Sequence, residues 1–271
     1  MSYHCIVIGN PIVHSKSPEL HQAFAKQTGV DLVYQRQLCP NDDGSFTAVV
    51  EAFFAGGGTG ANVTVPFKEM AFALCQTHGN LSDYAQGAGA VNTLAIQDGK
   101  LYGDNTDGRG LVNHMRQLGW KLEGQRVLIL GAGGASRGTL LPMLESGVSA
   151  IHIANRTANK AQALLDTLPV SDLPLSASSL DDIPDAHYDI VINATSIGLS
   201  GEALPFRRDL TATYAYDMMY GKPSAFLDFF NQQGATTSDG LGMLIHQGAL
   251  SFALWTDQAV DLVNLGNPFT A

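Results

Sequence analysis

The sequence has 271 residues, enough for two domains of ordinary size, and its 45% hydrophobic and 15% charged content is typical of globular proteins. With 25 acidic and 15 basic residues the net charge is −10, which argues against nucleic acid or an anionic membrane as a partner. The apolar runs are much shorter than the ~20 residues that span a bilayer, and the first residues contain no secretion signal. We therefore expect a cytoplasmic protein.

The three cysteines, Cys5, Cys39 and Cys75, are scattered and form no Cys-x-x-Cys pair. The eight histidines include no His-Glu-x-x-His spacing. We expect reduced, mostly buried thiols and no metal site.

The first predicted strand covers residues 5–8 and ends at Gly9. A helix follows that ends near Gly29, with Ser17 as its predicted N-cap and Pro18 as its first residue. Capping accounts for Ser17 and leaves Ser15 without a role. A structural role and a ligand-binding role therefore both remain open for the two serines.

A strand over residues 32–38 and a helix over residues 45–54 come next, followed by a strand from Gly60 that leads into another helix. Alternation places Asn62 and Thr64 on one face of this strand. Lys68 stands at the start of the helix, where its charge opposes the helix dipole at a cost of about 0.3–1 kcal/mol. It is either a solvated surface lysine or a residue with another purpose.

A hairpin with an Asp98-Gly99 turn is predicted next, and Asn92 falls within its first strand. Residues 103–108 are rich in polar residues and glycine, which is typical of a surface turn or of a hinge. We place the first domain boundary near residue 105.

From residue 127 the pattern becomes strand–helix–strand. Residues 127–130 predict a strand buried on both faces, residues 131–138 a glycine-rich turn, and residues 139–145 a helix. The free amides and the positive dipole end of that helix would face a phosphate group. The turn therefore predicts a nucleotide site, with an ordinary glycine-rich turn as the alternative.

The next strand covers residues 150–154, and Asn155 lies 24 residues after Gly131 (155 − 131). In a dinucleotide fold this strand end meets the adenosine ribose. An acidic residue is missing there, while Arg156 and Lys160 are present, which suits a 2′-phosphate. The alternative is a helix capped by Thr157 beside an incidental surface arginine.

Strands at residues 189–194 and 214–217 and helices at 158–168 and 224–233 continue the pattern, and a long helix follows Gly242. We expect an α/β protein with domains at residues 1–105 and 106–239. A C-terminal helical segment, residues 240–271, is expected to pack back on the first domain.

Nine motifs occur in order along the chain. They are Gly9-Asn10-Pro11 with His14-Ser15-Lys16-Ser17-Pro18, Ala61-Asn62-Val63-Thr64-Val65-Pro66-Phe67-Lys68, Gly89-Ala90-Val91-Asn92-Thr93, Gly103-Asp104-Asn105-Thr106-Asp107-Gly108, the glycine turn, Asn155-Arg156-Thr157, Asn193-Ala194-Thr195, Tyr216-Asp217-Met218 and Asp239-Gly240-Leu241-Gly242-Met243. Over nearly its whole length the chain resembles the shikimate dehydrogenase family.

The resemblance implies a substrate domain followed by a Rossmann-type, doubly wound NADP-binding domain. It also implies NADPH-dependent reduction of 3-dehydroshikimate to shikimate in aromatic amino acid biosynthesis, by a monomer or homodimer. Lys68 and Asp107 would be the catalytic acid–base pair. The implied substrate-binding residues are Ser15, Ser17, Asn62, Thr64, Asn92, Tyr220 and Gln247. The implied NADP(H)-binding residues are Gly131, Ala132, Gly133, Gly134, Ala135, Asn155, Arg156, Thr157, Lys160, Thr195, Met218 and Gly240.

Two alternatives remain open: a quinate/shikimate dehydrogenase of the same family, and a non-catalytic sensor that binds NADP. Lys68 and Asp107 are both present, which argues against the sensor. Residues 76–86 match no motif of the family, so their role is not predicted.

Overall fold

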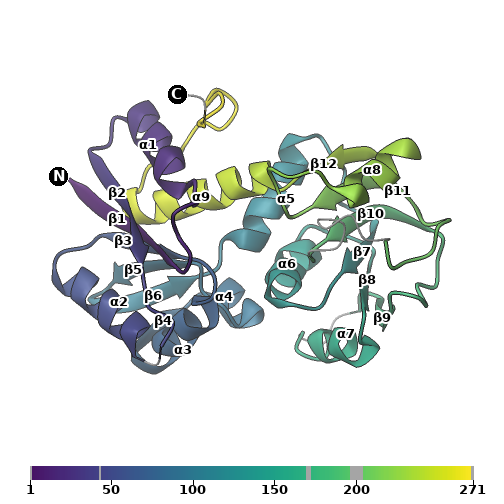
Figure 1. Ribbon diagram of the computed structural model, residues 1–271, viewed down its shortest axis with the longest axis horizontal. Coiled ribbons are helices and arrows are strands. Elements are labelled where there is room, and N and C mark those ends of the chain that lie inside the picture. The colour runs from purple at the N-terminus through teal and green to yellow at the C-terminus, as the bar shows by residue number, and fades with distance from the viewer. Residues whose placement is uncertain (1, 43, 169–171, 196–203, 270–271) are drawn as a thin grey trace. The chain divides into compact units, whose positions relative to one another are not determined.

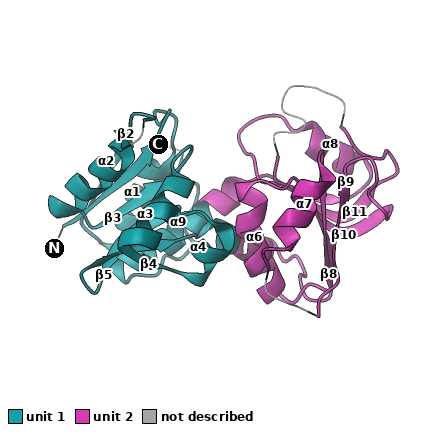
Figure 2. Cartoon of the chain, turned by 90° about the horizontal axis from the view of Figure 1, so that it is seen from below, with its two compact units in different colours: residues 1–110, 245–271 teal, residues 111–244 magenta. Residues whose placement is uncertain are grey.

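The computed structural model describes residues 2–42, 44–168, 172–195 and 204–269, which form two compact units (Figures 1 and 2). Unit 1 comprises Met1–Gly110 and Ile245–Ala271, and unit 2 comprises Leu111–Leu244. The structure changes from one unit to the other after Gly110 and after Leu244. The predicted domain boundaries, near residues 105 and 239, each lie five positions before these points (110 − 105 and 244 − 239). The last two residues of the predicted C-terminal segment lie outside the described part of the chain.

Unit 1 contains a mixed six-stranded sheet in the order β2-β1-β3-β5-β6-β4. The strands β1, β2 and β3 are parallel, whereas β5 is antiparallel to both β3 and β6. The strands are β1 Tyr3–Gly9, β2 Leu32–Leu38, β3 Gly60–Val63, β4 Gly79–Leu81, β5 Thr93–Gln97 and β6 Lys100–Asp104. The helices are α1 Ser17–Thr28, α2 Ser45–Ala55, α3 Lys68–His78, α4 Asp83–Ala88, the start of α5 Asp107–Gln117 and most of α9 Leu241–Thr256.

Helices cover both faces of this sheet (Figure 1). On one face, α2 and α3 bury Phe46 and Leu74 against apolar strand residues. On the other face, α1 and α9 build an aromatic layer in which His21 stacks on Tyr34 at 4.4 Å and lies 5.2 Å from Trp255. Because both faces are covered, the inner strands β1 and β3 are mostly buried, whereas the edge strand β2 keeps polar residues along its length.

The predicted hairpin is present, with Asp98 and Gly99 both at positive φ, as a two-residue turn of this kind requires. Asn92 lies one position before β5 rather than within it. Of the two interpretations of residues 103–108, the surface turn is wrong, because Asp104, Asn105 and Thr106 are buried and α5 begins at Asp107. Hydrogen bonds to neighbouring side chains satisfy these polar residues, which a local pattern does not reveal.

Unit 2 contains a parallel six-stranded sheet in the order β12-β11-β10-β7-β8-β9. This is the doubly wound order of dinucleotide-binding folds, with the strand order reversing between β7 and β10. Its strands are β7 Arg126–Leu130, β8 Ala150–Asn155, β9 Leu175–Ser179, β10 His187–Asn193, β11 Thr211–Asp217 and β12 Thr236–Ser238. Its helices are α6 Gly134–Glu145, α7 Ala158–Leu165 and α8 Ala225–Gln232, together with the remainder of α5 and the first turn of α9.

Two apolar clusters sandwich the second sheet. Leu140 of α6 and Leu164 of α7 belong to one cluster, and Phe226 and Phe230 of α8 belong to the other. Helix α6 begins at Gly134, five residues before the predicted start at residue 139 (139 − 134). Its first turn is therefore made by the glycine turn itself.

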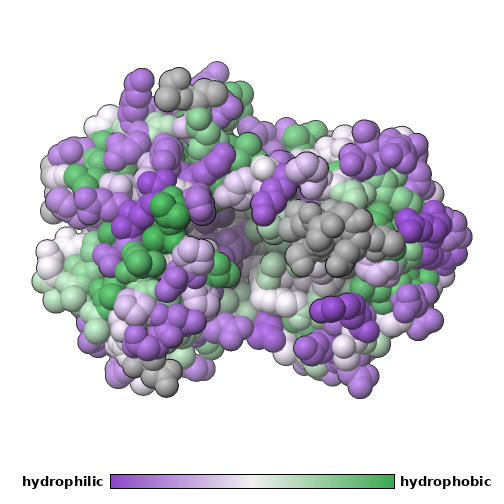
Figure 3. All heavy atoms as spheres, in the orientation of Figure 1, coloured by the Kyte–Doolittle hydropathy of each residue, from purple (hydrophilic) through white to green (hydrophobic). Residues whose placement is uncertain are grey.

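Among the described residues, no helix is long and apolar enough to cross a membrane. On the face shown in Figure 3, hydrophilic and hydrophobic residues are interspersed over both units. Local groups of side chains are therefore the candidates for capturing a ligand.

Candidate active site

Lys68 and Asp107 form a direct ion pair in unit 1. Nζ of Lys68 lies 2.6 Å from Oδ2 of Asp107, and both side chains are partly buried. Lys68 is the first residue of α3 and Asp107 the first residue of α5. An ammonium in this position can donate a proton or stabilise a developing alkoxide, and the carboxylate can orient it.

Asn92 connects this pair to the rest of the site. Its Nδ2 lies 2.8 Å from Oδ1 of Asp107 and 3.2 Å from Oε1 of Gln247. Its Oδ1 accepts from the backbone amide of Thr106 at 2.9 Å and from the hydroxyl of Thr93 at 2.9 Å. Asn92 is 2% exposed, so its amide is held in one orientation by the protein.

A second buried amide, Asn62 at the end of β3, is held in the same way. Oδ1 accepts the phenolic hydrogen of Tyr34 at 2.7 Å, and Nδ2 donates to Oγ of Ser251 at 3.0 Å. Burial raises the pKa of Tyr34 well above its ordinary value, so this phenol remains a donor. Thr64 follows β3, and a Cβ on Gly9 would lie 2.5 Å from its Cγ2, so only glycine leaves room there.

Ser15 and Ser17 lie together, with their Oγ atoms 3.2 Å apart. The predicted capping role of Ser17 is wrong: Lys16 occupies the N-cap position, Ser17 is the first helical residue, and no side chain caps α1. The backbone amide of Ser17 instead donates to Oγ of Ser15 at 3.3 Å. Because neither hydroxyl is used for capping, both can take part in binding an anion.

Gln247 and Tyr220, the remaining predicted substrate residues, belong to different units. Gln247 lies on α9, is buried, and approaches Asn92 and Thr106. Tyr220 follows β11 in unit 2 and is half-buried, and burial raises the pKa of its phenol. Hydrogen bonds within unit 1 alone thus join five of the predicted site residues, directly or through a single residue: Lys68, Asp107, Asn62, Asn92 and Gln247.

The glycine turn of unit 2 has the geometry of a phosphate cradle. Gly131 has a φ of +105°, and a Cβ there would meet Cγ2 of Thr195 at 2.6 Å. At Gly133 and Gly134 a Cβ would meet only open space. The first amides of a helix have no intrahelical acceptor, so Gly133, Gly134 and Ala135 can present them to a pyrophosphate. Gly131, Ala132 and Ser136 support this turn, the last through a 2.8 Å bond from its hydroxyl to the carbonyl of Gly131.

The predicted ribose end lies beside this turn, because Leu130 of β7 pairs with Ala154 of β8. Nδ2 of Asn155 bonds to the carbonyl of Thr157 at 3.0 Å, which shapes the start of α7. The side chains of Arg156 and Lys160 are exposed, and no described residue forms an ion pair with either. Two free cations beside a phosphate cradle fit the extra phosphate of NADP.

The third predicted cofactor segment surrounds Asp217, which is 1% exposed. Asn193 accepts from the amide and hydroxyl of Thr195 and donates to Asp217 at 3.3 Å. Asp217 also accepts from the amide of Met219 at 3.0 Å. A Cβ on Gly240 would lie 2.1 Å from the carbonyl of Met218, so these two predicted cofactor residues are in close contact.

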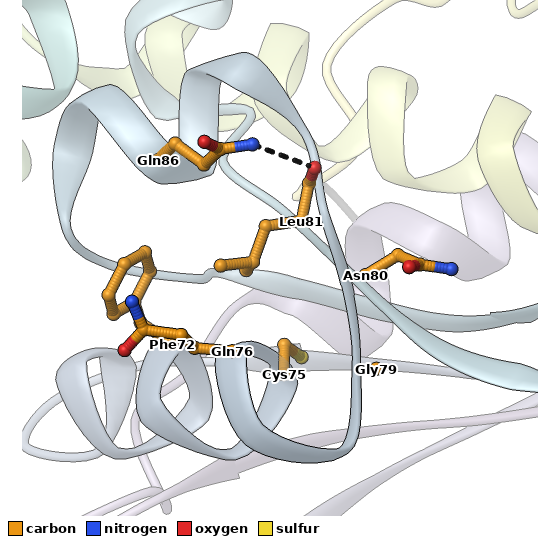
Figure 4. Close-up of a pocket in the computed structure, with 7 residues that line it drawn as sticks. All are labelled: Phe72, Cys75, Gln76, Gly79, Asn80, Leu81 and Gln86. Carbon is orange, nitrogen blue, oxygen red and sulfur yellow. Dashed lines mark hydrogen bonds between the residues drawn. The ribbon is translucent and has the colours of Figure 1, made fainter.

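Residues 76–86 form the end of α3, strand β4 and the start of α4, and they line much of an open cavity of about 490 Å³ (Figure 4). Its wall includes Phe72, Cys75, Gln76 and Gln86, and it carries no charged side chain. The amide of Gln86 is already bonded to the carbonyl of Leu81 at 3.3 Å. None of the predicted site residues lines this cavity.

Several residues that hold the site together were given no role from the sequence, although Thr106 and Asp217 lie in its motifs: Tyr34, Thr106, Asp217 and Ser251. Ser251 lies one helical turn after Gln247, so the spacing i, i+4 along α9 could have indicated it. Tyr34 could have been found only by knowing that β2 and β3 both flank β1.

A doubly wound sheet with a phosphate cradle, together with a lysine–aspartate pair in a separate α/β unit, defines a dinucleotide-dependent oxidoreductase. Comparison with known proteins is more specific. Residues 7–94 match the shikimate dehydrogenase substrate binding domain, residues 113–200 the shikimate / quinate 5-dehydrogenase family, and residues 240–263 the shikimate 5′-dehydrogenase C-terminal domain. The chain belongs to the shikimate dehydrogenase family.

Two relatives illustrate the similarity. The shikimate dehydrogenase (NADP(+)) of Psychrobacter cryohalolentis is 54% identical, with 97% of this chain and 96% of the relative covered. The protein of the same name from Acinetobacter baumannii is 52% identical, with 93% and 94% covered. Both alignments thus cover more than nine-tenths of this chain.

Solved structures agree. An Ael1 enzyme from Pseudomonas putida superposes with a TM-score of 0.89 at 41% identity, covering 96% of this chain and 95% of the other. Shikimate 5-dehydrogenase from Thermus thermophilus, in complex with NADP(H) and shikimate, gives a TM-score of 0.83 at 30% identity and covers 97% of both chains. The predicted two-domain α/β fold, with a doubly wound parallel sheet in its second domain, is therefore confirmed.

Proposed function

We propose that this protein catalyses the reversible, NADPH-dependent reduction of 3-dehydroshikimate to shikimate. The observation that carries this proposal is the Lys68–Asp107 pair, bonded at 2.6 Å and linked through Asn92 to Gln247. Reduction of a ring carbonyl needs a proton donor beside a set of groups that recognise neighbouring hydroxyls, and this cluster contains both. The relatives named for this activity support the same substrate and cofactor.

When bound, the reduced nicotinamide supplies the hydride. Lys68 donates a proton to the oxygen at C3 as negative charge develops there, and its charge stabilises that oxygen. Asp107 holds the ammonium in place and shares its proton. In the reverse direction the same pair receives the proton from the C3 hydroxyl.

We assign the substrate contacts by their chemistry. The hydroxyls of Ser15 and Ser17 bind the carboxylate, which lets a protein with a net charge of −10 hold an anion locally. Asn62, Thr64, Asn92 and Gln247 bind the ring hydroxyls and the carboxylate, and Tyr220 also contacts the substrate. The amides of Asn62 and Asn92 can serve because they are already oriented by the protein.

The cofactor contacts follow the three segments of unit 2. Gly131–Ala135 hold the pyrophosphate, and Asn155, Arg156, Thr157 and Lys160 hold the 2′-phosphate. Thr195, Met218 and Gly240 complete the cofactor site. The exposed cations, together with the missing acid at this strand end, favour NADP over NAD.

One spectrophotometric assay tests the proposal. Initial rates are compared for shikimate and quinate, each with NADP⁺ and NAD⁺. We expect the highest kcat/KM with shikimate and NADP⁺. A comparable rate with quinate would instead assign a quinate/shikimate dehydrogenase, and NADPH binding without any turnover would make the protein a sensor.

We also infer a cytoplasmic enzyme that is a monomer or a homodimer. Cys5, Cys39 and Cys75 are buried free thiols, as expected in a reducing compartment. Sedimentation equilibrium of the purified protein distinguishes the two oligomeric states.

A further inference from the structure

Arg36 of β2 makes an unusually dense set of contacts with the loop that carries Ser15. Its Nε and Nη2 both donate to the backbone carbonyl of Ser15, at 2.9 and 2.5 Å. Nη2 also lies 2.6 and 2.9 Å from the two carboxylate oxygens of Glu19. One guanidinium thereby ties the loop to the first turn of α1 and to the edge strand β2.

This contact fixes the orientation of Ser15. The amide of Ser15 donates to the carbonyl of Ile12 at 3.0 Å, so the residue is held at both its amide and its carbonyl. With the backbone held, Oγ of Ser15 is kept 3.2 Å from Oγ of Ser17. Two hydroxyls at this separation can both donate to one carboxylate group.

We propose that Arg36 is the positioning residue for the carboxylate of shikimate, acting through Ser15. The proposal rests on the function proposed above. Glu19 balances the charge of Arg36, so the pair adds little net positive potential and its effect on binding comes from geometry. A lysine cannot replace it, because a single ammonium does not reproduce a planar fork of donors.

Two variants, Arg36→Lys and Arg36→Gln, test this idea in the full-length protein. In both we expect KM for shikimate to rise about tenfold, equivalent to about 1.4 kcal/mol of binding. We expect kcat and KM for NADP⁺ to stay within about twofold, because Lys68, Asp107 and unit 2 are unchanged. A wild-type KM for shikimate in Arg36→Lys, together with a raised KM in Arg36→Gln, would overturn the geometric role. An unchanged KM in both variants would overturn the proposal.

A carboxylate-specific readout separates positioning from a general disturbance of unit 1. Shikimate methyl ester lacks the anionic group, so Arg36→Gln should raise its KM much less than it raises the KM for shikimate. An equal relative rise for acid and ester would contradict the assignment.

Arg207 offers a matched control. It forms a forked pair with Asp209 at 2.6 and 2.7 Å and donates to the carbonyl of Ile183 at 3.2 Å. Its side chain is 32% exposed, against 33% for Arg36. Arg207→Gln should therefore change thermal stability as little as Arg36→Gln and leave KM for shikimate unaltered.

Wild-type turnover is measured first. Its absence would refute the proposed function, whereas normal wild-type turnover together with an unaltered KM in the Arg36 variants would refute only the role of Arg36.

Discussion

The ammonium of Lys68 lies 2.6 Å from the carboxylate of Asp107, although 39 residues separate them in the chain. Both ends of this contact are anchored. The carbonyl of Lys68 accepts from the amide of Val91 at 2.9 Å, and Asp107 accepts from Asn92 at 2.8 Å. Contacts within the protein therefore hold the pair in place, as the proposed catalytic role requires.

Replacing Lys68 removes the proposed proton donor. We expect Lys68→Ala to lower kcat by about 10²–10⁴-fold with little change in KM for shikimate, since general acid catalysis contributes that much. Steady-state kinetics in the direction of shikimate oxidation provides the measurement. Lys100→Ala, at an exposed lysine next to the hairpin turn, is the control. Near wild-type turnover of Lys68→Ala would rule out the catalytic assignment.

Replacing Arg156 should alter cofactor choice without weakening the fold. Its guanidinium has no ion-pair partner among the described residues, so Arg156→Gln should leave the melting temperature unchanged. We expect the preference for NADP⁺ over NAD⁺, measured as a ratio of kcat/KM, to fall about 10- to 100-fold. Arg116→Gln, at another exposed arginine, should keep the ratio. An unaltered ratio in Arg156→Gln would place the 2′-phosphate elsewhere.

Gly110 of α5 should be intolerant of a side chain because of Gln247. A Cβ there would lie 2.7 Å from the backbone nitrogen and 2.8 Å from Cβ of Gln247, so α9 would have to move. We expect Gly110→Ala to lose about 1–3 kcal/mol of stability and to raise KM for shikimate. A double-mutant cycle with Gln247→Ala tests whether Gly110→Ala raises KM through Gln247. Strictly additive effects on KM would show that Gly110 does not act through Gln247.

His21 should make the protein sensitive to acid. It is fully buried, and burial lowers its pKa to about 3, with the neighbouring side chain of Asn62 acting in the opposite direction. Because the unfolded chain binds this proton below about pH 6.5 and the folded chain does not, stability falls between about pH 6.5 and about pH 3. This loss of stability with falling pH is the direction expected for a histidine that the folded protein keeps neutral.

His21→Phe, which can keep the 4.4 Å stack on Tyr34, removes this titration. When the pH is lowered from 7 to 5, the free energy of unfolding of the wild type should fall by about 2 kcal/mol more than that of the variant. Urea denaturation at the two pH values measures this difference, with His78→Gln at an exposed position as the control. Parallel pH dependence of His21→Phe and wild type would exclude His21 as the source.

Much of the fold could be predicted from local pattern. The strand Val127–Leu130 and its glycine turn were recognised because a run of apolar residues before glycines admits few other structures. The short edge strands β4, β9 and β12 were missed. With three to five residues each, their stability comes from pairing with a neighbour rather than from their own composition.

The candidate site divides in a similar way. Lys68 could be singled out because its charge opposes the helix dipole, and Arg156 because it follows the second strand where an acidic residue is missing. The contacts that orient the site could not be predicted. Asn62 is hydrogen-bonded to Tyr34, 28 positions away in the sequence, and to Ser251, 189 positions away. Such contacts depend on strand order and helix placement. Only family resemblance, which carries the folded arrangement implicitly, brought Asp107 to Lys68.

Unit 2 is an insertion within unit 1, and this matters while the chain is being made. Asn62 and Asn92 leave the ribosome early, whereas Gln247 and Ser251 follow only after the whole of unit 2. Until then the nascent sheet lacks α9, one of the two helices on the face that carries the aromatic layer, and two amides destined for burial remain accessible to water. Unit 1, which holds the proposed catalytic pair, is thus the first unit to be started during synthesis and the last to be completed.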